Sequence, residues 1–114
     1  SDHLFNDDML HITCAVPRYF YEEGNLIEVK DAPTFWGKIS FRIQISEETI
    51  TFTTDLKAFD KSKKLCIYLR LPDKNAKVSL ASTSGGSLII TGQRAVIEPT
   101  DNKVNIVFNI NKSH

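Results

Sequence analysis

The chain has 114 residues, of which 41% are hydrophobic and 25% are charged, and this ordinary composition excludes wholesale disorder and suits one globular domain with its own core. The 14 Lys and Arg residues balance the 14 Asp and Glu residues, so the chain lacks the basic character that nucleic-acid binding requires, and we expect no nucleic-acid partner. No apolar run approaches the ~20 residues of a membrane span, and residues 1–10 lack the pattern of a signal peptide.

The N-terminal third alternates poorly between apolar and polar residues. Only two short strands are expected there, at residues 10–14 and 26–30. Residues 38–46 then alternate cleanly, and residues 48–55 repeat the pattern after a short polar link. Such a pair predicts an antiparallel hairpin with one buried face.

The rest of the chain continues with the same two-residue period. Residues 76–82 place Val78 and Leu80 inward, and a turn is expected at Gly85–Gly86. Residues 56–64 could hold a single helical turn, and no longer helical stripe is visible. The remaining expected strands cover residues 63–72, 84–92, 94–99 and 101–111. Evenly spaced, one-faced strands predict an all-β fold: one antiparallel β-sandwich, Ig-like or jelly-roll-like, of about seven to nine strands over residues 1–114.

Two cysteines, Cys14 and Cys66, permit one disulfide without establishing it. Cys66 stands between the inward positions Leu65 and Ile67, so alternation points its side chain to the other face of its sheet. Whether the two cysteines pair is left open by the sequence.

No pattern of catalytic or metal-ligating residues is present. His11 and Cys14 are the only closely spaced metal-type pair, and no second pair completes a site. The adjacent acids at 7–8 and 22–23 are typical of solvated loops, and Gly85–Gly86 leads into a strand rather than a phosphate-binding helix. We therefore expect no catalytic residue, no cofactor and no metal in this chain.

Aromatic side chains are the remaining candidates for a site. Trp36, Tyr19, Tyr21 and Tyr68 could each present a ring to the apolar face of a sugar, and Phe35 stands beside Trp36. A lone tryptophan in a small sandwich is more often packed than exposed, which favours packing for Trp36.

Alternation makes a more detailed prediction for the neighbouring pair of rings. It places Trp36 on the polar face with Lys38, and Phe35 on the apolar face with Ile39.

Two stretches of the chain resemble the C-terminal β-sandwich region of bacterial glycoside-hydrolase-like proteins. The resemblance covers about half of the chain. In that region a PR-x-aromatic segment, a G-x-x-I-x-V strand, an APT-aromatic-aromatic-GK-(I/V)-S strand and a K-x-L-x-L-R-aliphatic-P strand follow one another. The matching positions here are Pro17, Arg18, Phe20 or Tyr21, Gly24, Ile27, Val29, residues 32–40 and residues 64–72.

The resemblance implies an accessory domain rather than an enzyme. In such proteins the catalytic acids lie upstream in a helical toroid domain, against which the terminal sandwich packs. The chain would then be the C-terminal piece of a longer periplasmic or extracellular protein, with the upstream catalytic domain as its partner and a polysaccharide as a further possible partner. Phe35 and Trp36 would either dock against the catalytic domain or close the end of the sandwich core. Gly37 would allow a close backbone approach. The expected V-N-G turn after Pro72 is missing, so no sugar-contacting loop is implied there.

Two other functions remain open on the sequence. A stand-alone carbohydrate-binding module would show a planar row of exposed aromatic rings. An Ig-like interaction or adhesion domain would act through a sheet face or a bare strand edge. An accessory domain would instead show an exposed apolar patch.

Overall fold

The computed structural model describes residues 9–16, 26–46 and 48–111, and these residues form nine β-strands without a helix. The strands are β1 (Met9–Ala15), β2 (Leu26–Thr34), β3 (Gly37–Ile45), β4 (Thr49–Asp55), β5 (Lys64–Arg70), β6 (Lys77–Ser84), β7 (Gly86–Thr91), β8 (Arg94–Pro99) and β9 (Lys103–Asn111).

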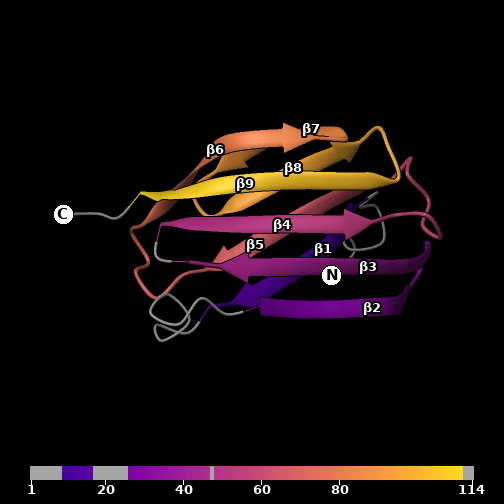
Figure 1. The fold of residues 1–114 in the computed structure, drawn as a ribbon, viewed down its shortest axis with the longest axis horizontal. Helices are drawn as coiled ribbons and strands as arrows, with labels where there is room; N and C mark the ends of the chain where they lie inside the picture. Colours follow the sequence, from indigo (N-terminus) through magenta and orange to yellow (C-terminus); the bar gives the residue numbers. More distant parts are fainter. Residues whose placement is uncertain (1–8, 17–25, 47, 112–114) are drawn as a thin grey trace, which may run out of the picture.

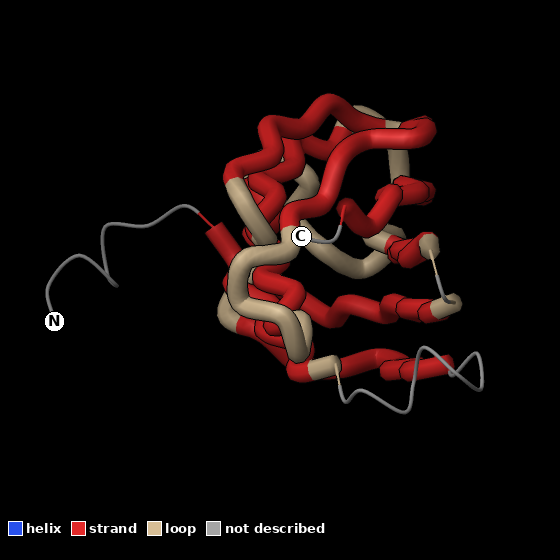
Figure 2. The backbone as a smooth tube through the Cα atoms, turned by 90° about the vertical axis from the view of Figure 1, so that its left-hand side faces the viewer, coloured by secondary structure: helices blue, strands red, loops and turns tan. Residues whose placement is uncertain are grey.

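The strands form two sheets that pack face to face. One sheet has the order β1-β5-β8-β7 and the other β2-β3-β4-β9-β6. Figure 1 shows the strands of the larger sheet in front of the smaller one, and Figure 2, which looks along the strands, shows the two layers. The predicted β-sandwich of seven to nine strands is confirmed.

The predicted hairpin is formed by β3 and β4, with Ile43 opposite Phe52 and Ile45 opposite Ile50. All neighbouring strands are antiparallel except β1 and β5, which pair in parallel. A parallel pair requires a long connection, and the chain between β1 and β5 passes through three strands of the other sheet.

The core lies between the sheets and is built from the inward positions of the two-residue pattern. Thr54 is the one buried polar side chain among the described residues, and its hydroxyl donates to the carbonyl oxygen of Ser40 at 2.7 Å. The largest fully buried side chains are Ile39, Ile43, Ile45, Ile50, Phe52, Leu56, Leu65, Ile67, Leu69, Ile97, Ile106 and Phe108.

Two local expectations were wrong. Leu80 lies opposite the buried Phe108 of β9, yet it is 44% exposed, because β6 is an edge strand and its register against β9 shifts directly after Leu80. The link from β4 to β5 holds no helical turn. Two successive tight turns form it instead, in which Phe59 N–H donates to Leu56 O and Lys63 N–H donates to Asp60 O, each at 3.1 Å.

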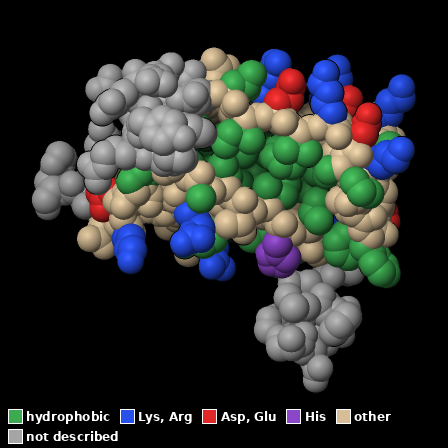
Figure 3. All heavy atoms as spheres, turned by 90° about the horizontal axis from the view of Figure 1, so that it is seen from below, with side chains coloured by type: hydrophobic (Ala, Val, Ile, Leu, Met, Phe, Trp, Pro, Cys, Tyr) green, Lys and Arg blue, Asp and Glu red, His purple; other side chains and the backbone are tan. Residues whose placement is uncertain are grey.

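The two sheets separate on the side where β1 and β2 are the outer strands. The inward residues of β2, among them Ile27 and Val29, are only half-buried, because a four-stranded sheet opposes a five-stranded one. Figure 3, seen from this side, shows hydrophobic side chains gathered beside a border of charged ones.

Candidate functional site

Phe35 and Trp36 form the two-residue turn between β2 and β3. The Thr34 hydroxyl organises this turn, since it accepts a hydrogen bond from Trp36 N–H at 3.1 Å and donates one to Gly37 O at 2.6 Å. Gly37 has a φ of 118°, a left-handed value that favours glycine. We call this segment, residues 34–37, the hairpin tip.

The link between β4 and β5 braces the hairpin tip from the side. Lys38 N–H donates to Ala58 O at 2.9 Å, and Asp60 N–H donates to Trp36 O at 3.1 Å. A Cβ atom on Gly37 would collide with the carbonyl oxygen of Ala58. The close backbone approach expected at Gly37 is therefore present, and the neighbour is this link.

The two rings of the hairpin tip have opposite exposures. Phe35 is 92% exposed, whereas Trp36 is half-buried and packs against the core. The faces predicted from alternation were wrong, because both residues lie in the turn and the two-residue period of a strand does not extend through it.

The rings do not form a flat platform. Their centroids lie 5.7 Å apart and their planes meet at 67°. The ammonium nitrogen of Lys63 lies 5.8 Å from the centroid of the Trp36 ring, a cation–π distance. A sugar cannot stack across both rings at once in this geometry.

Asp60 anchors the bracing link through its carboxylate. The Ser62 hydroxyl and the Ser62 N–H both donate to its Oδ1, at 2.7 and 3.0 Å. These hydrogen bonds, the hydroxyl first, lower the pKa of the Asp60 carboxyl, and the charge of Lys63 adds to them.

Tyr68 lies at the other end of the sandwich, near the end of β5, on the outer face of the four-stranded sheet. It pairs with Thr13 on β1 and with Arg94 on β8. The guanidinium carbon of Arg94 lies 4.4 Å from the centroid of the Tyr68 ring, so the arginine stacks on the aromatic ring.

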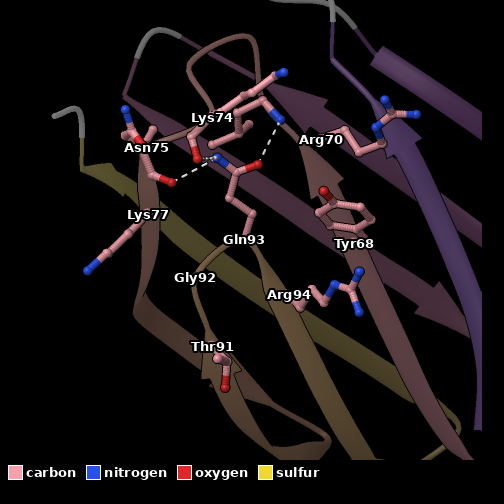
Figure 4. Close-up of a pocket in the computed structure, with 11 residues that line it drawn as sticks. Tyr68, Arg70, Lys74, Asn75, Lys77, Thr91, Gly92, Gln93 and Arg94 are labelled. Carbon is pink, nitrogen blue, oxygen red and sulfur yellow. Dashed lines mark hydrogen bonds between the residues drawn. The ribbon is translucent and has the colours of Figure 1, made fainter.

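Gln93 ties together the loops beside Tyr68. Its Nε2 donates to the carbonyl oxygens of Asp73 and Ala76 at 2.9 and 2.8 Å, and its Oε1 accepts from Leu71 N–H at 3.1 Å. Figure 4 shows Gln93 at the centre, with Tyr68 and Arg94 on one side and Asn75 and Lys77 on the other. A hollow of about 760 Å³ surrounds this group.

The structure thus brings Phe35 and Trp36 together and places Tyr68 at the opposite end. Tyr19 and Tyr21 lie outside the described residues. Sequence reasoning missed Arg94 and Gln93. Their roles depend on β8 pairing with β5 and on the turn before β8, so only the strand order would have pointed to them.

Cys14 and Cys66 are not joined by a disulfide. Cys14 faces the core, whereas Cys66 faces the outer side of the same sheet, as alternation predicted. Burial raises the pKa of the Cys14 thiol.

In residues 9–16, 26–46 and 48–111, no three His, Cys, Asp or Glu side chains lie close enough to hold a metal ion. The same residues include no helix of the length and apolar character needed to cross a membrane. Comparisons with protein families, with curated protein sequences and with solved structures found no match for this chain.

Proposed function

We propose that this chain is a non-catalytic accessory domain of a carbohydrate-active protein, and that its hairpin tip docks onto a neighbouring domain. The upstream catalytic domain is the proposed partner. The parent protein would act in the periplasm or outside the cell, where polysaccharides are degraded.

The exposure of Phe35 on a braced turn is the observation that carries the docking role. A large apolar ring that is 92% exposed is costly in water, and exposed aromatic residues are enriched where proteins contact one another. Backbone hydrogen bonds from the β4–β5 link hold the turn beneath it, so little ordering would be needed on contact.

The carbohydrate setting comes from the sequence resemblance and stays part of the proposal. The geometry favours docking over sugar stacking, because the rings of Phe35 and Trp36 meet at 67° and Arg94 already occupies one face of Tyr68. A module that grips a flat glycan surface needs coplanar rings.

The β2 edge of the larger sheet is poorly suited to accept another strand, as an adhesion domain would do there. β2 lies at the edge of the larger sheet, and its register shifts between Val29 and Ala32. Pro33 lacks an N–H group to donate, and Asp31 has a positive φ of 51°. Bulges and prolines are devices that protect sheet edges from pairing.

The docking role is tested by hydrogen exchange in the longer protein and in this domain alone. We expect the amides of residues 34–37 and of the β4–β5 link to exchange more slowly in the longer protein. Phe35→Ser should remove that added protection. Ile89→Ser is the matched control, because Ile89 is also exposed, at 74%, but lies on the outer face of the smaller sheet.

Equal exchange at the hairpin tip in both proteins would overturn the docking role. The binding-module alternative has its own test, affinity electrophoresis through gels containing a panel of polysaccharides. Retardation that Trp36→Ala abolishes in a folded variant would replace docking with glycan binding at the hairpin tip.

A further inference from the structure

A hollow at the end of the sandwich opposite the hairpin tip collects positive charge. It has a volume of about 760 Å³, within the range of small-molecule sites, and lies between the end of β5, the β5–β6 link and the β7–β8 turn. Among the described residues that line it, the charged side chains are all cationic: Arg70, Lys74, Lys77 and Arg94.

Within the part of the chain that the structure describes, no ion pair neutralises these cations. The ion pairs between described residues, Arg42–Glu28 and Lys64–Glu98, involve none of them. The nearest acid in the loop is Asp73, whose carboxylate accepts a hydrogen bond from Asn75 N–H at 2.9 Å. Because the whole chain has zero net charge, the hollow is a local excess of positive charge that attracts an anion.

Arg94 is held in a position suited to bind an oxyanion. Its guanidinium stacks on the Tyr68 ring, with 4.4 Å between the guanidinium carbon and the ring centroid. Stacking fixes the plane of the group while its N–H edge stays available, and this edge matches the two oxygens of a carboxylate. Arg70 lies two residues after Tyr68, on the same face of β5.

The frame of the hollow is rigid. The side-chain amide of Gln93 donates to Asp73 O and Ala76 O and accepts from Leu71 N–H, so it fixes the β5–β6 link against the β7–β8 turn. Gln93 is therefore a positioning residue, with its hydrogen-bonding capacity directed to the backbone and away from a ligand.

Uncharged polar groups stand among the cations. Thr91 pairs with Arg94 across β7 and β8, and Asn75 lines the hollow on the far side of Gln93. A hydroxyl and an amide can both donate to and accept from the hydroxyl groups of a sugar, whereas an inorganic anion would use only their donors.

We propose that this hollow binds an acidic oligosaccharide, whose carboxylate is held by Arg94 and whose hydroxyls meet Thr91 and Asn75. Arg70 and Lys74, which lie apart from Arg94 (Figure 4), add positive charge elsewhere along the hollow. Nucleic acid fits less well, because Tyr68 is the one aromatic ring among the described residues that line the hollow, and Arg94 already closes one face of it to base stacking. The site goes beyond the docking role and does not depend on it, since the hairpin tip is at the other end.

The test is calorimetric titration and amide NMR of this chain with a trimer of galacturonic acid. The trimer methylated at every carboxylate is the neutral control, and inorganic sulfate and phosphate are the simple anions. We expect the acid to shift the amides of Tyr68, Arg70 and Arg94 at millimolar concentration or below. Arg94→Gln should weaken binding about tenfold, as expected for a charge-assisted bidentate contact.

Arg94→Lys keeps the charge and loses the planar fork of N–H groups. We therefore expect its affinity for the acid to lie between those of the wild type and Arg94→Gln. Lys57→Gln, in the β4–β5 link at the opposite end, makes the same charge change and should leave binding unaltered. Equal binding of the methylated trimer would overturn the role of charge, and equal binding of inorganic anions would overturn the role of the sugar. No binding of the acid by a folded protein would overturn the site, and it would leave the docking proposal intact.

Discussion

Asp60 connects the hairpin tip to two residues of the β4–β5 link through hydrogen bonds. Its N–H donates to Trp36 O, its carbonyl oxygen accepts from Lys63 N–H, and its carboxylate accepts both donors of Ser62. The ionised carboxylate accepts the Ser62 hydrogen bonds more strongly than the protonated carboxyl does, which is why the pKa of this acid is lowered in the folded protein. The bracing of the exposed Phe35 thus depends in part on one surface charge.

This dependence gives a pH prediction. A carboxyl with a lowered pKa in the folded state stabilises fully above its unfolded pKa, and that contribution is lost as the pH falls through the folded pKa. We expect Asp60→Asn to lower the free energy of unfolding at neutral pH, and the difference from wild type to shrink below about pH 4. Urea titrations followed by the fluorescence of Trp36, the single tryptophan, measure it.

Asp101→Asn is the control for this prediction. Asp101 is exposed in the β8–β9 link, so Asp101→Asn makes the same change of charge at a site away from Ser62. A difference between wild type and Asp60→Asn that stays constant from neutral pH to pH values below 3 would contradict the role of the ionised carboxylate.

The two cysteines give a second prediction at this scale. Both side chains are buried, they face opposite sides of one sheet, and burial raises the pKa of the Cys14 thiol. Thiolate is the reactive form, so we expect slow labelling of the native protein by a disulfide reagent and two labelled thiols per chain after unfolding without reductant. Finding no thiols after unfolding would show that the cysteines are paired.

At the scale of elements, the glycine turn between β6 and β7 carries the chain from one sheet to the other. Gly85 has a φ of 81°, and its carbonyl oxygen accepts from Thr100 N–H and Asp101 N–H at 2.8 and 3.1 Å. A Cβ on Gly85 would collide with the carbonyl oxygen of Lys103. The turn at Gly85 therefore also holds the β8–β9 link in place through these hydrogen bonds.

Gly92, in the turn between β7 and β8, is a matched comparison. Its φ is 63°, but a Cβ there would meet no atom within 4 Å. We expect Gly92→Ala to cost about 1 kcal/mol, the strain of a left-handed alanine, and Gly85→Ala to cost about 3 kcal/mol or more, because the backbone must also move. Equal urea midpoints for the two variants would contradict the collision.

Alternation predicted most strands and their buried faces, because a one-residue slip would expose the whole apolar side of a strand such as β3 or β4. It failed at Leu80, which lies on an edge strand directly before a bulge, and at Phe35 and Trp36, which form a turn. The stacking of Arg94 on Tyr68 depends on strand order, which pairs residues 26 positions apart and leaves no local pattern.

At the scale of the whole molecule, the two ends of the sandwich have different chemistry. One end presents the exposed ring of Phe35 on the hairpin tip. The other end presents the cations of the hollow around Gln93, whose side-chain amide is held by backbone hydrogen bonds. The hydrophobic core between them holds both ends in place. We therefore expect substitutions at each end to change the proposed docking and the proposed ligand binding independently.

Two phenylalanines test this division between core and surface. Phe52 is fully buried, with its ring centroid 6.1 Å from that of Phe41, whereas Phe35 is 92% exposed. We expect Phe52→Ala to lower the free energy of unfolding by about 3–5 kcal/mol, since it leaves a cavity between the sheets. Phe35→Ala should change it by less than about 0.5 kcal/mol.

Urea unfolding of the two variants measures this difference, and Phe52→Leu provides a milder core change if Phe52→Ala does not fold. A large loss of stability for Phe35→Ala would mean that this ring packs against the domain itself. A small loss, together with slower exchange at the hairpin tip in the longer protein, would assign the ring to a contact outside the domain, because a side chain that contributes nothing to folding is then shielded only by a partner.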